Sequence, residues 1–154
     1  MLIDRNDVEN FCGKLRSEKK IIVFTNGCFD ILHVGHVRYL SAAKNFGEVL
    51  IVGLNTDSSV KVLKGNDRPI NNENDRAEVL LALKSVDHVV LFHERTAEKL
   101  IAEIKPDVYV KGGDYTLETL PEAKIVQSYG GRVEFIPMVA GRSTTNVIKK
   151  ISKV

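Results

Sequence analysis

The sequence predicts a single α/β domain built on a mostly parallel sheet. Short apolar runs alternate with amphipathic helical segments from one end of the chain to the other. No internal repeat, low-complexity tract or linker interrupts this alternation, and 154 residues suffice for one full hydrophobic core. Because strand–helix–strand units cross over with a right hand, we expect helices on both faces of the sheet.

Five apolar runs bounded by turn residues predict the strands. They lie at residues 21–24, 49–52, 88–92, 108–110 and 132–136. Apolar residues at helical spacing predict the intervening helices. These lie at residues 35–46, 72–85, 97–104, 121–129 and 144–151, after a leading helix near 4–19. The order predicts a Rossmann-like sheet of about five strands, with a leading helix (1–20) before a core (21–151), all within one domain of residues 1–154.

Charge and cysteine content exclude several classes of protein. The formal net charge of +2 is too small to favour nucleic acid or an anionic membrane as a partner. No apolar run approaches membrane-spanning length and no apolar signal region opens the chain, so we expect a cytoplasmic location. Cys12 and Cys28 fit neither a metal-ligand spacing nor a disulfide framework, which favours a reducing compartment and no metal held by the protein.

Two histidines three residues apart follow the first predicted strand of the core. The segment TNGCFDILHVGH ends in His33 and His36, where a strand gives way to a helix. Backbone N–H groups at a helix start lack partners and the helix dipole favours anions, so this segment predicts a phosphate site. Either histidine alone is as readily a cap or a packed residue. Together with Asn26, Gly27 and Asp30 the pair favours a functional site.

Three further polar segments follow predicted strands, so the fold brings them to the same edge as the histidines. They are residues 53–57 with the basic residues after them, residues 111–115, and residues 141–145. In the last, a glycine precedes hydroxyl residues at a helix start, which is typical of an anion site. The alternatives are that these hydroxyls only cap the helix and that the basic residues form a solvated loop.

Four other residues have plainer interpretations. Lys44 lies two turns beyond His36 and is more often a surface residue than a ligand. His88 and His93 flank an apolar strand without partners and are interpreted as structural or exposed. Cys28 is expected to be a small packed residue, because the sequence places no base or second thiol beside it.

On these residues the chain resembles the nucleotidyltransferase superfamily whose signature pairs His-x-Gly-His with a distal Ser/Thr-rich motif. Here the motifs are HVGH at 33–36 and RSTT at 142–145, and the resemblance covers residues 21–151. Within the superfamily the chain is most similar to the heptose 1-phosphate adenylyltransferases. The stretches that carry this similarity are LKG at 63–65, RPIN at 68–71, VKGGDY at 110–115 and STTN at 143–146.

The resemblance implies transfer of AMP from ATP to D-glycero-D-manno-heptose 1-phosphate with release of pyrophosphate. The alternative branch is glycerol-3-phosphate cytidylyltransferase, which shares the first motif. Its members tend to carry arginine where this chain has Met138 and an aliphatic residue where it has Arg142. Val62 stands where heptose enzymes often have arginine, which leaves the sugar phosphate open. A catalytically silent nucleotide-binding module is the non-enzyme alternative, and the full set of motifs argues against it.

The chemistry of nucleotidyl transfer and the resemblance together suggest roles. His33 and His36 would stabilise charge on the α-phosphate and leaving group, while Ser143, Thr144 and Thr145 would hold the β- and γ-phosphates. The other expected nucleotide-binding residues are Asn26, Gly27, Cys28, Phe29, Asp30, Lys111, Gly112, Asp114, Gly141 and Arg142. The expected pool for the acceptor phosphate is Lys44, Lys61, Lys64, Arg68 and Arg76. Mg²⁺ would be bound mainly through the ATP phosphates, with few protein ligands.

The partners implied by the resemblance are small molecules: a nucleoside triphosphate and a sugar phosphate. Many family members are fused to a sugar kinase, so we expect a separate kinase upstream of this chain in the pathway. Related enzymes are often dimers, which makes a homodimer an expectation, although no periodicity in the sequence identifies an interface.

Overall fold

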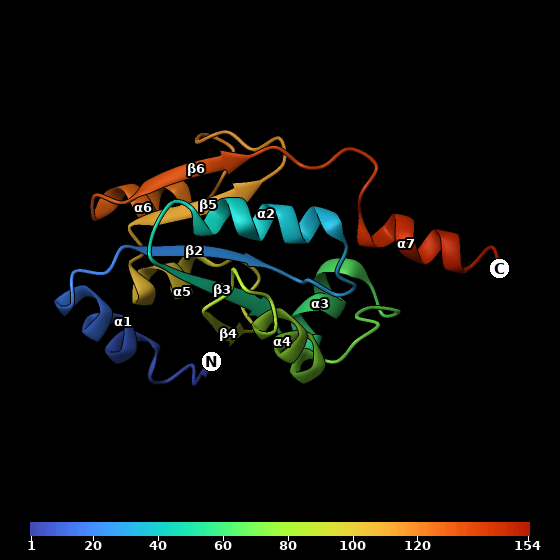
Figure 1. Ribbon diagram of the computed structural model, residues 1–154, viewed down its shortest axis with the longest axis horizontal. Coiled ribbons are helices and arrows are strands. Elements are labelled where there is room, and N and C mark those ends of the chain that lie inside the picture. Colours follow the sequence, from blue (N-terminus) through green and yellow to red (C-terminus); the bar gives the residue numbers. More distant parts are fainter.

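The computed structural model describes residues 1–154 and contains a six-stranded, all-parallel sheet between helices (Figure 1). The strands are β1 (Leu2–Ile3), β2 (Ile22–Gly27), β3 (Val49–Asn55), β4 (His88–Phe92), β5 (Val108–Gly112) and β6 (Arg132–Ile136). The helices are α1 (Val8–Ser17), α2 (Val34–Lys44), α3 (Asp57–Lys64), α4 (Glu73–Leu81), α5 (Glu98–Ile104), α6 (Ala123–Ser128) and α7 (Thr144–Ile151). The predicted α/β class is confirmed, with one strand more than expected.

Two elements were not predicted from the sequence. Strand β1 pairs with β4 at the edge of the sheet, and its two residues are too few to show an alternating pattern in the sequence. Helix α3 begins directly after β3, where the Thr56 side chain accepts a hydrogen bond from the backbone N–H of Ser59. The helix has only eight residues, which is shorter than the window of about 11–18 residues over which an apolar period is judged.

The two faces of the sheet carry separate apolar clusters. Helices α1, α5 and α6 cover one face, and their buried residues pack on side chains of β2, β3, β4 and β5. Helices α2 and α4 cover the other face. The central strand β3 is buried over all seven residues, as expected for a strand covered on both faces. Cys12 is fully buried in the first cluster, in keeping with a structural thiol.

The strand order β1-β4-β3-β2-β5-β6 places a switch point between β2 and β5. The chain leaves β2 toward helix α2 on one face, whereas it leaves β5 toward α6 on the other. The carboxyl ends of these two strands therefore border a crevice, as the sequence predicted. Helix α7 begins at this same edge and extends beyond the sheet (Figure 1). No helix is both long and apolar enough to span a membrane.

Candidate active site

A cavity of about 700 Å³ opens at the carboxyl ends of β2 and β5. Its size is within the range of small-molecule sites. Five cationic side chains and two carboxylates line this cavity. The cations belong to Lys64, Arg68, Arg95, Lys111 and Arg142, and the carboxylates to Asp30 and Glu122. The cations outnumber the carboxylates, so the cavity carries an excess of positive charge that suits a polyanion. Asp30 is paired with Arg68.

The two motif histidines lie together in the cavity wall. His33 is the N-cap of α2, and its Nδ1 accepts a hydrogen bond from the backbone N–H of Gly35 at 3.1 Å. A neutral ring that accepts at Nδ1 carries its proton on Nε2, which fixes His33 as a donor there. The rings of His33 and His36 stack with centroids 3.9 Å apart. The two rings therefore lie side by side at the start of α2, with His33 capping the helix and His36 in its first turn.

Both histidines are neutral at pH 7. Burial, and to a smaller extent the neighbouring His33, lower the pKa of His36 to about 4. Burial also lowers the pKa of His33, with a smaller effect from Arg142. The Nδ1 atom of His36 is buried without a hydrogen-bond partner. A neutral imidazole still donates one N–H, so the pair offers donors to phosphate oxygens without two fixed charges.

The hydroxyls at the start of α7 have three different roles. Ser143 is the N-cap, since its Oγ accepts from the backbone N–H of Asn146 at 3.1 Å. The hydroxyl of Thr144 donates to the carbonyl of Ile31 at 2.9 Å and so ties α7 to the loop before α2. No hydrogen bond within the protein involves the Thr145 hydroxyl. Capping therefore explains Ser143, and Thr145 is the hydroxyl left free at the cavity.

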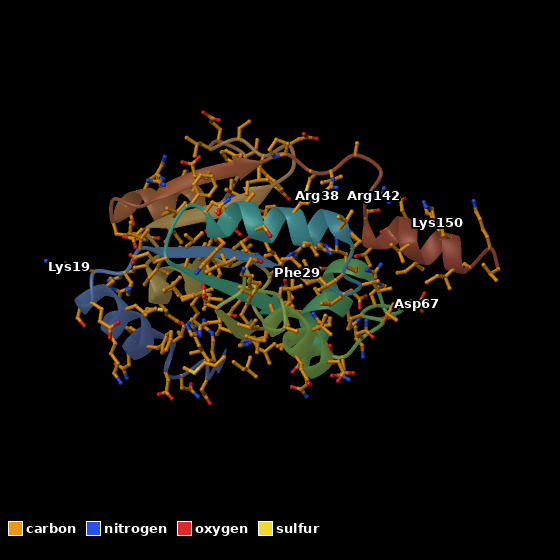
Figure 2. All side chains as sticks on the ribbon, viewed as in Figure 1. Lys19, Phe29, Arg38, Asp67, Arg142 and Lys150 are labelled. Carbon is orange, nitrogen blue, oxygen red and sulfur yellow. The ribbon has the colours of Figure 1, made fainter.

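The start of α7 lies close to the histidines because Gly35 has no side chain. A Cβ at Gly35 would lie 2.8 Å from the His33 ring and 3.3 Å from Cβ of Arg142. Figure 2 shows Arg142 where the connection from β6 reaches α7, beside the start of α2. The two sequence motifs, which lie far apart along the chain, therefore form one wall of the cavity.

Asp30 holds the basic loop against the histidine segment. The residue is 4% exposed, and its carboxylate accepts from the backbone N–H groups of Ile70 and Asn71 and from Nε of Arg68, each at 2.9 Å. Burial alone would raise the pKa of Asp30, but these donors outweigh it and hold the pKa below its ordinary value. Asp30 is thus a positioning residue that fixes Arg68 at the cavity.

The ends of β2 and β5 form the floor of the cavity. The amide oxygen of Asn26 accepts from the hydroxyl of Tyr109 at 2.7 Å, which leaves its NH₂ group as a donor. Lys111 has no carboxylate partner, its Nζ lies 5.2 Å from the centroid of the Tyr115 ring, and burial lowers its pKa. Gly27, Cys28 and Phe29 also line the cavity.

Several predicted site residues lie elsewhere. Lys44 is at the far end of α2, where it contacts the Asp87 carboxylate before β4, so the structure does not bring this predicted acceptor-phosphate residue to the cavity. The buried Arg76 side chain donates to the carboxylate of Asp57 and to the carbonyls of Cys28 and Asn71. It thereby connects the segments that follow β2 and β3 with the segment before α4. Four more residues do not line the cavity: Lys61, Gly112, Asp114 and Gly141.

The glycines among those four have structural reasons to be present. A Cβ at Gly112 would lie 2.9 Å from Sδ of Met138 and 3.1 Å from the Tyr39 ring, so Gly112 is needed for packing. Gly141 has a φ of +71°, a left-handed conformation that favours glycine. Lys61 is exposed on α3, and Asp114 is exposed just past β5.

The residues on one side of the cavity were not predicted from the sequence. Arg95 and Thr96 follow β4, and Thr119 and Glu122 precede α6. The rule that found the other segments, polar residues just past a strand, applies equally to Arg95 and Thr96. Glu122 lies well beyond the end of β5, and no sequence pattern indicated it.

The fold and the site together define a class. A parallel sheet with a cationic cavity at its switch point, lined by a histidine pair and a helix start, belongs to a nucleotide-binding α/β protein. A family model described as cytidylyltransferase-like matches residues 24–150. The chain belongs to the cytidylyltransferase-like family and is a nucleotidyltransferase.

Curated relatives and solved structures agree with this membership. The bifunctional protein HldE of Geobacter metallireducens is 54% identical over 148 residues, and that of Aliarcobacter butzleri 54% over 149 residues. These matches cover 94% and 96% of the chain, which spans about 30% of the length of either relative. The lipopolysaccharide core biosynthesis protein from Thermoplasma volcanium matches with a TM-score of 0.63 and 34% identity, over 78% of this chain and 97% of that one.

A more distant structure shares the fold alone. Pantothenate synthetase from Thermus thermophilus matches with a TM-score of 0.61 but only 15% identity, over 88% of this chain and 65% of that chain.

Proposed function

We propose that the protein transfers AMP from ATP to D-glycero-D-manno-heptose 1-phosphate and releases pyrophosphate. The observation that carries this proposal is the wall in which the stacked His33 and His36 meet the free hydroxyl of Thr145. The identity to HldE proteins and to a lipopolysaccharide core biosynthesis protein supports a heptose acceptor. Such an acceptor, a sugar 1-phosphate, must be supplied by a phosphorylating reaction.

The reaction needs alignment more than covalent chemistry. An oxygen of the acceptor phosphate attacks the α-phosphorus in line, and the bond to pyrophosphate breaks. Negative charge then grows on the phosphate oxygens between the His pair and α7. The Nε2–H of His33 and the remaining N–H of His36 would stabilise that charge, and one such donor contributes about 2.7–4 kcal/mol of barrier lowering.

The β- and γ-phosphates would lie at the start of α7. There Thr145 offers a hydroxyl, the helix offers free backbone N–H groups, and Arg142 adds a cation. Mg²⁺ fits this arrangement only as a companion of the triphosphate, because no group of three His, Cys, Asp or Glu side chains could hold it. When bound, it would neutralise charge on the phosphate oxygens.

The acceptor phosphate would be bound by Lys64 and Arg68. Both side chains line the cavity. Asp30 holds Arg68 through its Nε, and the other two guanidinium nitrogens of Arg68 have no partner in the protein. These are the two members of the predicted basic pool that the structure brings to the site. Lys111 and the Asn26 amide would contact the nucleotide from the floor of the cavity.

A substrate matrix tests the proposal. Four nucleoside triphosphates are combined with several sugar and polyol phosphates, and pyrophosphate release is measured for each pair. We expect turnover with ATP and the heptose 1-phosphate. Turnover confined to CTP with glycerol 3-phosphate would instead establish the cytidylyltransferase activity. ATP binding without pyrophosphate release for any acceptor would identify a silent nucleotide-binding module.

A further inference from the structure

One side of the cavity has no role in the mechanism above. We name it the distal wall, and it consists of Arg95, Thr96, Thr119 and Glu122. The histidines enter the cavity from α2 on one face of the sheet. The distal wall comes from the connections to α5 and α6, which cover the opposite face. A ligand that fills the cavity therefore contacts the His pair at one side and the distal wall at the other.

Glu122 is the distinctive residue of this wall. It is 6% exposed, and its Oε1 accepts from the backbone N–H of Ala97 at 3.4 Å. Its other carboxylate oxygen has no hydrogen-bond partner in the protein and keeps some exposure at the cavity, where it can accept a hydrogen bond from a ligand. No cationic side chain lies within ion-pair distance of Glu122. The pKa of Lys111 is lowered by burial, and the Glu122 charge offsets only part of that effect.

The charge of Glu122 decides which part of the substrates can lie there. A carboxylate repels phosphate oxygens, so the triphosphate and the acceptor phosphate belong at the cationic side of the cavity. A carboxylate accepts hydrogen bonds, and sugar hydroxyls donate them. The guanidinium of Arg95 adds donors, and the Thr96 hydroxyl, which itself donates to Glu98, adds an acceptor. Pro121, exposed beside Glu122, adds an apolar surface for the carbon face of a sugar ring.

We infer that the distal wall binds the hydroxyl groups of the acceptor sugar, with Glu122 as the hydrogen-bond acceptor that selects a polyhydroxylated sugar phosphate. This inference rests on the proposed function and specifies how its acceptor is recognised. A site built to pair with hydroxyls discriminates strongly against a substrate that lacks them, because such a substrate displaces water from the Glu122 oxygen without replacing its hydrogen bond. Glycerol 3-phosphate, with three carbons and two hydroxyls, offers the distal wall fewer hydrogen-bond partners and would gain less from Glu122.

The test compares Glu122→Gln with the matched control Glu118→Gln. Glutamine keeps the shape and an oxygen for the Ala97 N–H but loses the charge, and Glu118 is exposed on the same connection outside the cavity. Steady-state pyrophosphate release gives KM for both substrates, and calorimetry gives the Kd of the heptose 1-phosphate. For E122Q we expect KM and Kd of the heptose phosphate to rise about tenfold or more, as for loss of a charged hydrogen bond. KM for ATP and the weak turnover of glycerol 3-phosphate should stay within about twofold, as should every parameter of E118Q.

The outcomes separate this inference from the function on which it rests. An unchanged KM for the heptose phosphate in an otherwise active E122Q overturns the inference and leaves the proposed function intact. A rise in KM for ATP alone also overturns it, because the wall would then bind the nucleotide. Wild-type protein that releases no pyrophosphate with any sugar phosphate overturns both. If E122Q unfolds, Arg95→Gln supplies the same comparison, since that side chain is exposed and has no protein hydrogen bond.

Discussion

The imidazole rings of His33 and His36 stack at the start of α2 with their centroids 3.9 Å apart. Burial and then the neighbouring His33 lower the pKa of His36, whereas burial and then Arg142 lower the pKa of His33. The hydrogen bond from the Gly35 N–H to Nδ1 of His33 fixes which nitrogen of that ring carries the proton. The relationship makes the pair a preorganised set of neutral donors, which suits stabilisation of phosphate charge better than general-base catalysis.

Removal of one ring should abolish most turnover without unfolding the protein. We expect His36→Ala to lower kcat by about 10²- to 10³-fold, because one donor to the developing charge is lost. His93→Ala is the matched control, since that histidine is exposed and lies outside the cavity. Pyrophosphate release measures kcat, and thermal melting checks the fold. Near-wild-type turnover in H36A would remove the histidine pair from the mechanism.

The lowered pKa of His36 should make stability depend on pH. In the native state burial lowers this pKa to about 4, whereas the unfolded chain has the ordinary value of about 6.5. Between these values the unfolded state binds more protons, so stability is full above pH 6.5 and falls as the pH drops toward 4. Because the ring is partly exposed, we expect a loss on the order of 1 kcal/mol.

Urea unfolding at pH 7 and pH 5 measures that dependence. In His36→Asn the contribution should vanish, so the variant should lose less stability between the two pH values than the wild type does. Equal losses in both proteins would show that His36 has an ordinary pKa in the folded state.

The sheet and its functional edge could be predicted because they depend on local pattern. The buried strand β3 is an apolar run from Val49 onward, and parallel strands bring the polar residues after them to one edge. The side of the site that was missed has a different origin. Glu122 reaches the cavity through the path of the connection between β5 and α6, which no periodicity in the sequence describes.

The basic residues illustrate the same limit. The sequence predicts the same role, binding of the acceptor phosphate, for Lys44 and Lys64. In the structure Lys44 lies at the end of α2 and Lys64 at the end of α3. Helix α2 begins at the carboxyl edge of the sheet and runs away from it, so its last residue reaches the opposite edge. Helix α3 was not predicted, and its short length keeps Lys64 beside the cavity. Distance along a helix, and not residue type, decides which lysine can bind a substrate.

This contrast between two lysines leads to a direct test. Lys64→Ala should raise KM for the acceptor phosphate about tenfold, because it removes a cation from the cavity wall. Lys44→Ala should leave both KM values unchanged and lower stability by less than about 1 kcal/mol, since its partly exposed contacts with the Asp87 carboxylate and the Glu48 carbonyl are lost. Steady-state kinetics and urea unfolding give these values. A larger kinetic effect at Lys44 than at Lys64 would contradict the placement of the acceptor phosphate.

Two glycines within helices allow the geometry of the histidine wall to be tested without removal of any functional group. Gly35→Ala would place a Cβ 2.8 Å from the His33 ring, so the ring must move and give up its bond to the backbone and its stack on His36. We expect kcat to fall about tenfold or more, with little change in stability because a side chain can yield. Gly13→Ala, in α1, meets nothing within 4 Å and should raise stability by about 0.5–1 kcal/mol with normal kcat. Pyrophosphate release and urea unfolding on both variants separate the two effects, and full activity in G35A would show that the ring stack is dispensable.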